Sequence, residues 1–95
     1  MVEVAQSTQA RIDLLLGLLV SRWREVPHVA AEIDGWDLLD QLRYTESWPA
    51  EDELLRSLDA HAAEGTLTPE QHERYRQLRR LVDTNEPVLR KILET

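Results

Sequence analysis

The side chains in this sequence that could do chemistry are three histidines and 18 acidic residues. Di-iron carboxylate bundles use a Glu-x-x-His spacing on two helices and a further Glu on each of two others. Only Glu25 and His28 have this spacing, and Pro27 between them disturbs the helical geometry that the site needs. The sequence therefore predicts no metal site and no cofactor.

Catalytic motifs are also missing from the sequence. It has no cysteine, its three glycines are scattered rather than gathered in a phosphate-binding loop, and its serines lack the nucleophile-elbow pattern. Acid–base catalysis needs a dry pocket that perturbs a pKa. A chain of 95 residues buries only about 60–65% of its unfolded surface, which leaves little room for one. We expect a protein that is not an enzyme.

The net charge of −7 bears on the kind of partner. Nucleic-acid binding depends on Lys and Arg that neutralise phosphates, so this balance argues against it. The exception is a group of four arginines at residues 74–80, Arg74, Arg76, Arg79 and Arg80, and a small helical DNA-binding regulator that uses them stays open as an alternative. A solvated helix face interleaved with acids is the simpler interpretation of the same arginines.

The acidic residues gather in the middle third of the chain. Residues 32–64 contain ten acids and two arginines, a net charge of −8, whereas the other two thirds are close to neutral. Acids at helix starts match the helix dipole and explain part of this pattern. A docking surface for a basic partner explains it equally well, because complementary charge accelerates association.

Two tryptophans lie beside these acids at predicted helix starts. Tryptophan is enriched where binding energy concentrates, and an indole next to carboxylates suits a partner that presents Arg or Lys. The alternative is that each indole packs a helix entrance. The predicted partner-binding residues are Trp36, Asp37, Asp40, Trp48, Glu51, Asp52 and Glu53.

Helical periodicity runs through the whole chain, with no strand pattern. The sequence predicts a single all-α domain over residues 1–95, a compact bundle of four or five helices at approximately 3–25, 35–43, 49–64, 69–84 and 87–94. Prolines set most of these boundaries. Trp36, Leu39 and Leu42 should form the buried side of the second helix. The clearest local signal is a stop at Gly65 followed by a capping box between Thr68 and Gln71.

The first predicted helix is apolar over roughly 240° of its circumference between residues 12 and 23, far more than a surface helix needs. It is expected to be either the central helix of the fold or an interface between two subunits. The predicted homodimer interface consists of Leu14, Gly17, Leu18 and Ser21.

The leading hypothesis for function is a non-enzymatic binding module, similar in role to an antitoxin, an immunity protein or an inhibitor, that regulates or neutralises a basic protein. A self-associating scaffold protein is the alternative. No apolar run approaches the ~20 residues of a membrane-spanning helix, and no leader pattern is present, so we expect a cytoplasmic protein with no membrane contact.

Overall fold

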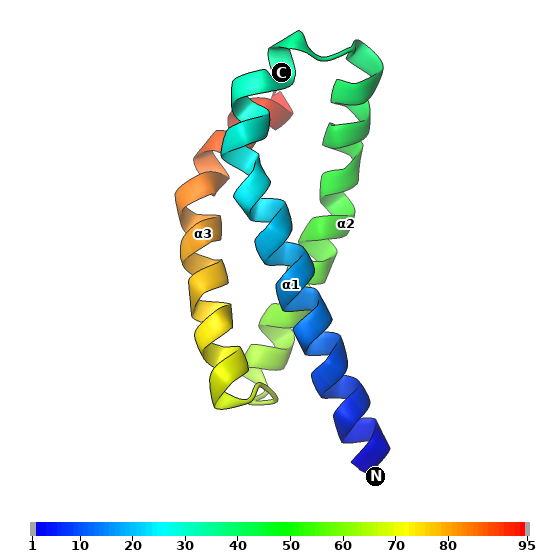
Figure 1. Ribbon diagram of the computed structural model, residues 1–95, viewed down its shortest axis with the longest axis vertical. Coiled ribbons are helices and arrows are strands. Elements are labelled where there is room, and N and C mark those ends of the chain that lie inside the picture. Colours follow the sequence, from blue (N-terminus) through cyan, green and yellow to red (C-terminus); the bar gives the residue numbers. More distant parts are fainter. Residues whose placement is uncertain (1, 95) are drawn as a thin grey trace.

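The computed structural model describes the backbone of residues 2–94 and the side chains of residues 8–94. Over this range the chain forms three long helices and one short 3₁₀ turn: α1 (Val2–Glu32), η1 (Ile33–Gly35), α2 (Leu38–Ala63) and α3 (Pro69–Glu94). Figure 1 shows α1 running diagonally across the α2–α3 hairpin, and its N-terminal end extends past the loop that joins the two other helices. The bundle measures 49 × 23 × 16 Å.

The all-helical prediction is confirmed, but the predicted number of helices is wrong. The two helices expected at 35–43 and 49–64 are replaced by the single helix α2, which begins at Leu38 and ends at Ala63, and residues 69–84 and 87–94 lie together in α3. Pro27, Pro49 and Pro87 are all inside helices. An interior proline removes one hydrogen bond and costs about 3 kcal/mol.

Burial on both sides of each proline explains why the helices continue. Val26 and Val29 flank Pro27 and belong to the core, while Leu89 and Ile92 follow Pro87 into it. The prolines themselves are exposed, so their rings lie on the solvent side, away from the packed face. Burying two aliphatic side chains stabilises by about 3–6 kcal/mol, which exceeds the loss of one hydrogen bond.

Helix α1 is the central element, because most of the contact between helices involves it and the contact between α2 and α3 is small. Its core residues follow helical spacing and are almost fully buried: Ile12, Leu15, Leu16, Leu19, Trp23 and Val26. Contact with two other helices at once accounts for the unusually broad apolar arc seen in the sequence. Two leucines of that arc, Leu14 and Leu18, remain exposed.

The turn between α2 and α3 has the predicted structure. Gly65 has φ = 73°, a left-handed conformation that glycine adopts without strain. The Thr68 hydroxyl accepts a hydrogen bond from the Gln71 amide at 3.1 Å, and the Gln71 side-chain oxygen accepts one from the Thr68 amide at 3.0 Å. The capping box is therefore confirmed, and it starts α3 at Pro69.

The inward face predicted for residues 35–43 is correct for Trp36, which packs against the core, and wrong for Leu39 and Leu42. Leu39 and Leu42 are exposed, as is Leu38, whereas Tyr44 and Trp48 are buried. Because α2 is one continuous helix, the buried residues along the whole helix determine which side faces the core. Tyr44, Trp48 and Leu58 occupy that side, and Leu42 lies on another.

Candidate functional site

The structure separates the seven predicted partner-binding residues. Trp36, Asp37 and Asp40 line one open groove. Glu51 is half-buried and pairs with Arg22 at 3.7 Å, while Asp52 and Glu53 are exposed outside the groove. Trp48 is only 1% exposed, so the prediction that it is a surface anchor is wrong. Its ring packs edge-to-face on Trp23, with ring centroids 5.0 Å apart, in the core between α1 and α2.

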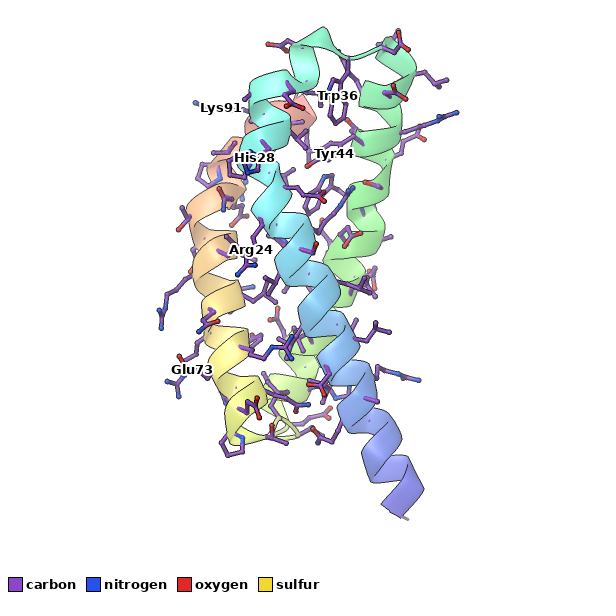
Figure 2. The ribbon with its side chains drawn as sticks, viewed as in Figure 1. Arg24, His28, Trp36, Tyr44, Glu73 and Lys91 are labelled. Carbon is purple, nitrogen blue, oxygen red and sulfur yellow. The ribbon has the colours of Figure 1, made fainter. Side chains whose placement is uncertain are left out.

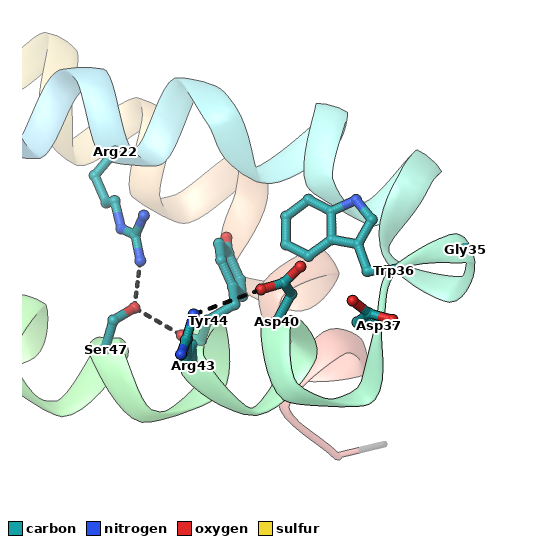
Figure 3. A pocket seen from close by; sticks show the side chains of 8 residues that line it. All are labelled: Arg22, Gly35, Trp36, Asp37, Asp40, Arg43, Tyr44 and Ser47. Carbon is teal, nitrogen blue, oxygen red and sulfur yellow. Dashed lines mark hydrogen bonds and ion pairs between the residues drawn. The ribbon is translucent and has the colours of Figure 1, made fainter.

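The groove lies between α1 and the segment that joins η1 to α2, and it has a volume of about 680 Å³. Figure 3 shows its lining from close by. Arg22 comes from α1, and the other lining residues come from η1, the connection and the first turns of α2: Gly35, Trp36, Asp37, Asp40, Arg43, Tyr44 and Ser47. On α2 these residues recur every three or four positions, so one side of the helix forms the wall.

Arg22 closes one end of the groove. Its guanidinium lies 4.9 Å from the ring centroid of Tyr44 and 5.1 Å from that of Trp48, and it donates a hydrogen bond to the hydroxyl of Ser47. Glu25 at 3.8 Å and Glu51 at 3.7 Å balance its charge. Arg22 is therefore held by two aromatic rings and two carboxylates. In a partly desolvated place the attraction between a guanidinium and an aromatic ring is stronger than at an exposed site.

A series of edge-to-face aromatic contacts connects the groove to the core. Trp36 packs on Tyr44 with centroids 6.0 Å apart, and Tyr44 packs on Trp48 at 5.9 Å. Such pairs contribute roughly 0.5–1.5 kcal/mol beyond the area that they bury. Burial raises the pKa of Tyr44 above its ordinary value, against the lowering influence of a hydrogen bond with Trp48 and of the charge on Arg22.

The hydroxyl oxygen of Tyr44 and the indole nitrogen of Trp48 are both shielded from solvent, and their contact with each other falls short of normal hydrogen-bond geometry. A buried polar atom without a partner costs about 1–3 kcal/mol. Tyr44 is only 7% exposed, yet it is part of the groove lining. The Tyr44 ring contributes to the groove wall, while its hydroxyl is not accessible from the groove.

The opposite end of the groove holds an indole and two carboxylates. Trp36 is half-buried, whereas Asp37 and Asp40 are exposed. Asp37 occupies the N-cap position of α2 without a side-chain capping bond, and Asp40 lies 3.9 Å from Arg43 in an ion pair whose two side chains are largely exposed. Exposed pairs of this kind contribute little stability, so both carboxylates are available to another cation.

On the side turned away from the groove, the start of α2 exposes three leucines. Leu38, Leu39 and Leu42 are 71%, 56% and 48% exposed. Leu38 and Leu42 are one turn apart, so their side chains are neighbours on the solvent side of α2. Contiguous apolar side chains framed by charged residues are typical of protein-binding surfaces.

The predicted dimer residues are all exposed on α1. Leu14 and Leu18 are 62% and 50% exposed, and Gly17 and Ser21 accompany them. Gly17 and Ser21 also line a second groove between α1 and α3, together with Arg24 and other polar residues. Figure 2 shows Arg24 on the α3 side of α1 and Trp36 and Tyr44 on the α2 side, so the two grooves occupy different faces.

The arginines of α3 are mostly neutralised. Arg74 pairs with Asp13 at 3.4 Å, Arg76 with Glu73 at 3.5 Å, and Arg79 with Asp59 at 3.7 Å and Asp83 at 3.9 Å. This arrangement matches a solvated helix face. It leaves little concentrated positive charge for contacts with phosphates.

Sequence analysis did not identify Arg22, Arg43, Tyr44 and Ser47 as parts of a site. The spacing of Asp40, Tyr44 and Ser47, three or four residues apart, indicates that they lie on one side of a helix. The predicted break before Pro49 placed Tyr44 and Ser47 outside a helix, so this pattern was missed. Arg22 carries no such signal, because only the packing of α1 on α2 brings it into the groove.

Among the side chains of residues 8–94, no three His, Asp or Glu side chains gather as a metal site would require. Within the described helices, none is long and apolar enough to span a membrane. Comparison of the chain with protein-family models, with curated proteins and with solved structures found no significant match.

Proposed function

We propose that this protein is a non-enzymatic binding module that engages a basic, amphipathic helix of a partner protein. The proposed contact surface is the side of α2 that is turned away from the groove. The observation that carries the proposal is the combination of three exposed leucines, Leu38, Leu39 and Leu42, with the exposed carboxylates of Glu46 and Glu53 on that side. Antitoxins, immunity proteins and inhibitors are functional classes that would use such a module.

Leu38, Leu39 and Leu42 form the apolar part of the proposed surface. Each fully buried leucine stabilises by about 1.5–3 kcal/mol relative to an exposed one. These three leave most of that stabilisation unused in the isolated chain, although α2 has an otherwise well-packed face. A partner helix that lays its own apolar side on this surface would recover it.

Charge determines the kind of helix that fits. Residues 32–64 have a net charge of −8, and α2 presents exposed Glu46 and Glu53 on the same side as the leucines. A partner with Lys or Arg beside its apolar stripe would be steered toward this surface and held in register, while an acidic one would be repelled.

The experiment uses a synthetic Leu/Lys amphipathic helix of about 20 residues, long enough to be helical when bound. We expect it to bind the full chain with an affinity that falls as salt rises. Leu38→Ala with Leu42→Ala should weaken binding at least tenfold, and Glu46→Gln with Glu53→Gln should weaken it and flatten the salt dependence.

Two controls make the result specific. A Leu/Glu helix of the same length should not bind. Glu70→Gln with Glu73→Gln on α3 removes the same amount of charge elsewhere and should leave affinity unchanged. If the α2 and α3 variants lose affinity equally, or if the Leu/Lys helix does not bind at all, the proposal is wrong.

Self-association through α1 is the second candidate, because Leu14 and Leu18 are exposed on a helix that already contacts both others. Gly17 between them lets a second copy approach closely, since no atom lies within 4 Å of the position that its Cβ would take. Light scattering after size exclusion tests it. A dimer that Leu14→Glu dissociates would support this candidate, and a monomer at high micromolar concentration would refute it.

A further inference from the structure

We infer that two copies of the chain pair through α1 in antiparallel orientation, with the two-fold axis midway between Leu14 and Leu18. The inference rests on the self-association candidate described above, and it adds the orientation of the two helices and the charged contacts that select it. It does not depend on the proposed binding surface of α2, which lies on another helix.

The contact face is a stripe along the exposed side of α1. Its residues recur at alternating intervals of three and four positions, which is the spacing of a seam between paired helices: Arg11, Leu14, Leu18, Ser21 and Glu25. All five are exposed, so neither α2 nor α3 covers the stripe, although α1 runs across both of them (Figure 1). The stripe is apolar in the middle and carries opposite charges at its two ends.

Charge favours a second copy on this stripe over other parts of the molecule. Each copy has a net charge of −7, so two copies repel one another over much of their surface. Residues 1–31 contain three acids and three arginines and have no net charge, whereas residues 32–64 have a net charge of −8. Two copies can therefore meet at α1 without the repulsion that the acidic segment would impose.

The two charged ends decide between parallel and antiparallel pairing. Parallel pairing would place Arg11 beside Arg11 of the second copy and Glu25 beside its own counterpart, and like charges that face each other are unfavourable. Antiparallel pairing about the proposed axis places Arg11 opposite Ser21 of the second copy. Glu25 of that copy is then one turn, about 6 Å, further along, within reach of two long side chains. The two-fold symmetry makes this contact twice.

Both charged side chains are available for this contact. Arg11 makes no ion pair with any side chain of residues 8–94. Glu25 lies 3.8 Å from Arg22, but its side chain is 55% exposed, and Arg22 has a second carboxylate in Glu51 at 3.7 Å. Glu25 can therefore turn toward the second copy while Arg22 keeps a counter-charge.

The same axis brings the leucines together. Leu14 of each copy lies opposite Leu18 of the other, since both are two residues from the axis. These side chains are 62% and 50% exposed in the single chain, so pairing buries apolar surface that nothing else covers. Four leucines form a small contact, and we expect a weak dimer whose population depends on concentration.

Exchange of the two charges tests the orientation, with the dimer dissociation constant measured by sedimentation equilibrium. Arg11→Glu and Glu25→Arg each replace two attractive contacts by two repulsive ones, so each should weaken dimerisation about tenfold. Arg11→Glu with Glu25→Arg in one chain restores both contacts and should return the dissociation constant to within about threefold of wild type. A parallel dimer would not respond in this way, because its like charges would only change sign.

Arg80→Glu is the matched control. Arg80 is exposed on α3, away from the stripe, and its replacement changes the net charge by the same amount as Arg11→Glu. It should leave dimerisation nearly unchanged. Circular dichroism establishes that each variant is folded, and Arg11→Glu, at an exposed position, provides the test by itself if Glu25→Arg disturbs the contacts of Arg22.

A distance between spin labels measures the orientation directly. The chain has no cysteine, so His28→Cys, at an exposed position of α1, introduces a single site for a nitroxide. Antiparallel pairing places this position 12 residues from the axis in each copy, which separates the two labels by about 36 Å along the helices. Parallel pairing would bring them within about 20 Å. Double electron–electron resonance distinguishes these distances.

The possible results separate orientation from association. If the wild-type chain is a monomer at high micromolar concentration, the self-association candidate is wrong and the antiparallel pair falls with it. If the chain dimerises but Arg11→Glu behaves like Arg80→Glu, or if the labels lie within about 20 Å of one another, association stands and the antiparallel pair is refuted.

Discussion

The contrast between Trp48 and Leu42 provides the most direct test of how α2 is oriented. Both are large apolar side chains on the same helix, six residues apart, and sequence patterns alone suggest the wrong one for the surface. Trp48 is 1% exposed and Leu42 is 48% exposed. The perturbation is truncation of each side chain, as Trp48→Ala and as Leu42→Ala in separate variants.

The expected magnitudes follow from the contacts. Trp48 packs on Trp23 and Tyr44, and its ring lies under the Arg22 guanidinium. Truncation of a buried tryptophan lowers the free energy of unfolding by about 3–5 kcal/mol, because the transfer energy is lost and a cavity remains. In a domain of this size the change lowers Tm by roughly 15–30 °C. Leu42→Ala removes a half-exposed side chain and should change stability by about 0.5 kcal/mol or less.

Urea denaturation followed by far-UV circular dichroism measures both variants on the same scale. Trp48→Phe keeps an aromatic ring in the core and provides an intermediate case if Trp48→Ala does not fold. Equal losses of stability in the tryptophan and leucine variants would refute the orientation of α2. So would a larger loss for Leu42→Ala, and the binding surface proposed above would then lose its leucines to the core.

Two further predictions concern an alkaline transition and a proline. Burial and the hydrogen bond to Asp59 raise the pKa of Tyr75 from its ordinary 10.0 to about 12, so the folded chain resists its ionisation, and stability should fall as pH rises through that window. Tyr75→Phe should make urea midpoints less dependent on pH between these values, and an unchanged dependence would contradict this account. Pro49→Ala restores a backbone donor inside α2 and should raise the free energy of unfolding by about 1–3 kcal/mol, whereas Ala50→Pro should lower it. If Pro49→Ala is neutral or destabilising in urea denaturation, the assumed local cost of this proline is wrong.

Local interactions explain what the sequence by itself determined. Helical periodicity, the left-handed stop at Gly65 and the reciprocal capping bonds of Thr68 and Gln71 involve residues within a few positions of one another. All the groups that make these interactions lie within one or two turns of the chain, so the local sequence is sufficient to predict them. The same is true of the broad apolar arc of α1, which predicts a helix with more than one packed side.

Only tertiary structure decided whether the prolines end their helices and which residues of α2 face outward. A proline costs a helix a fixed local amount, and the packing of buried side chains on either side of Pro27 and Pro87 outweighs it. Once α2 continues through Pro49, the burial of Trp48 and Leu58 turns Leu38 and Leu42 to the solvent. The groove also depends on tertiary packing, because Arg22 reaches Tyr44 and Ser47 only when α1 and α2 pack together. Arg22 and Ser47 are 25 residues apart in sequence, so no local pattern predicts their contact.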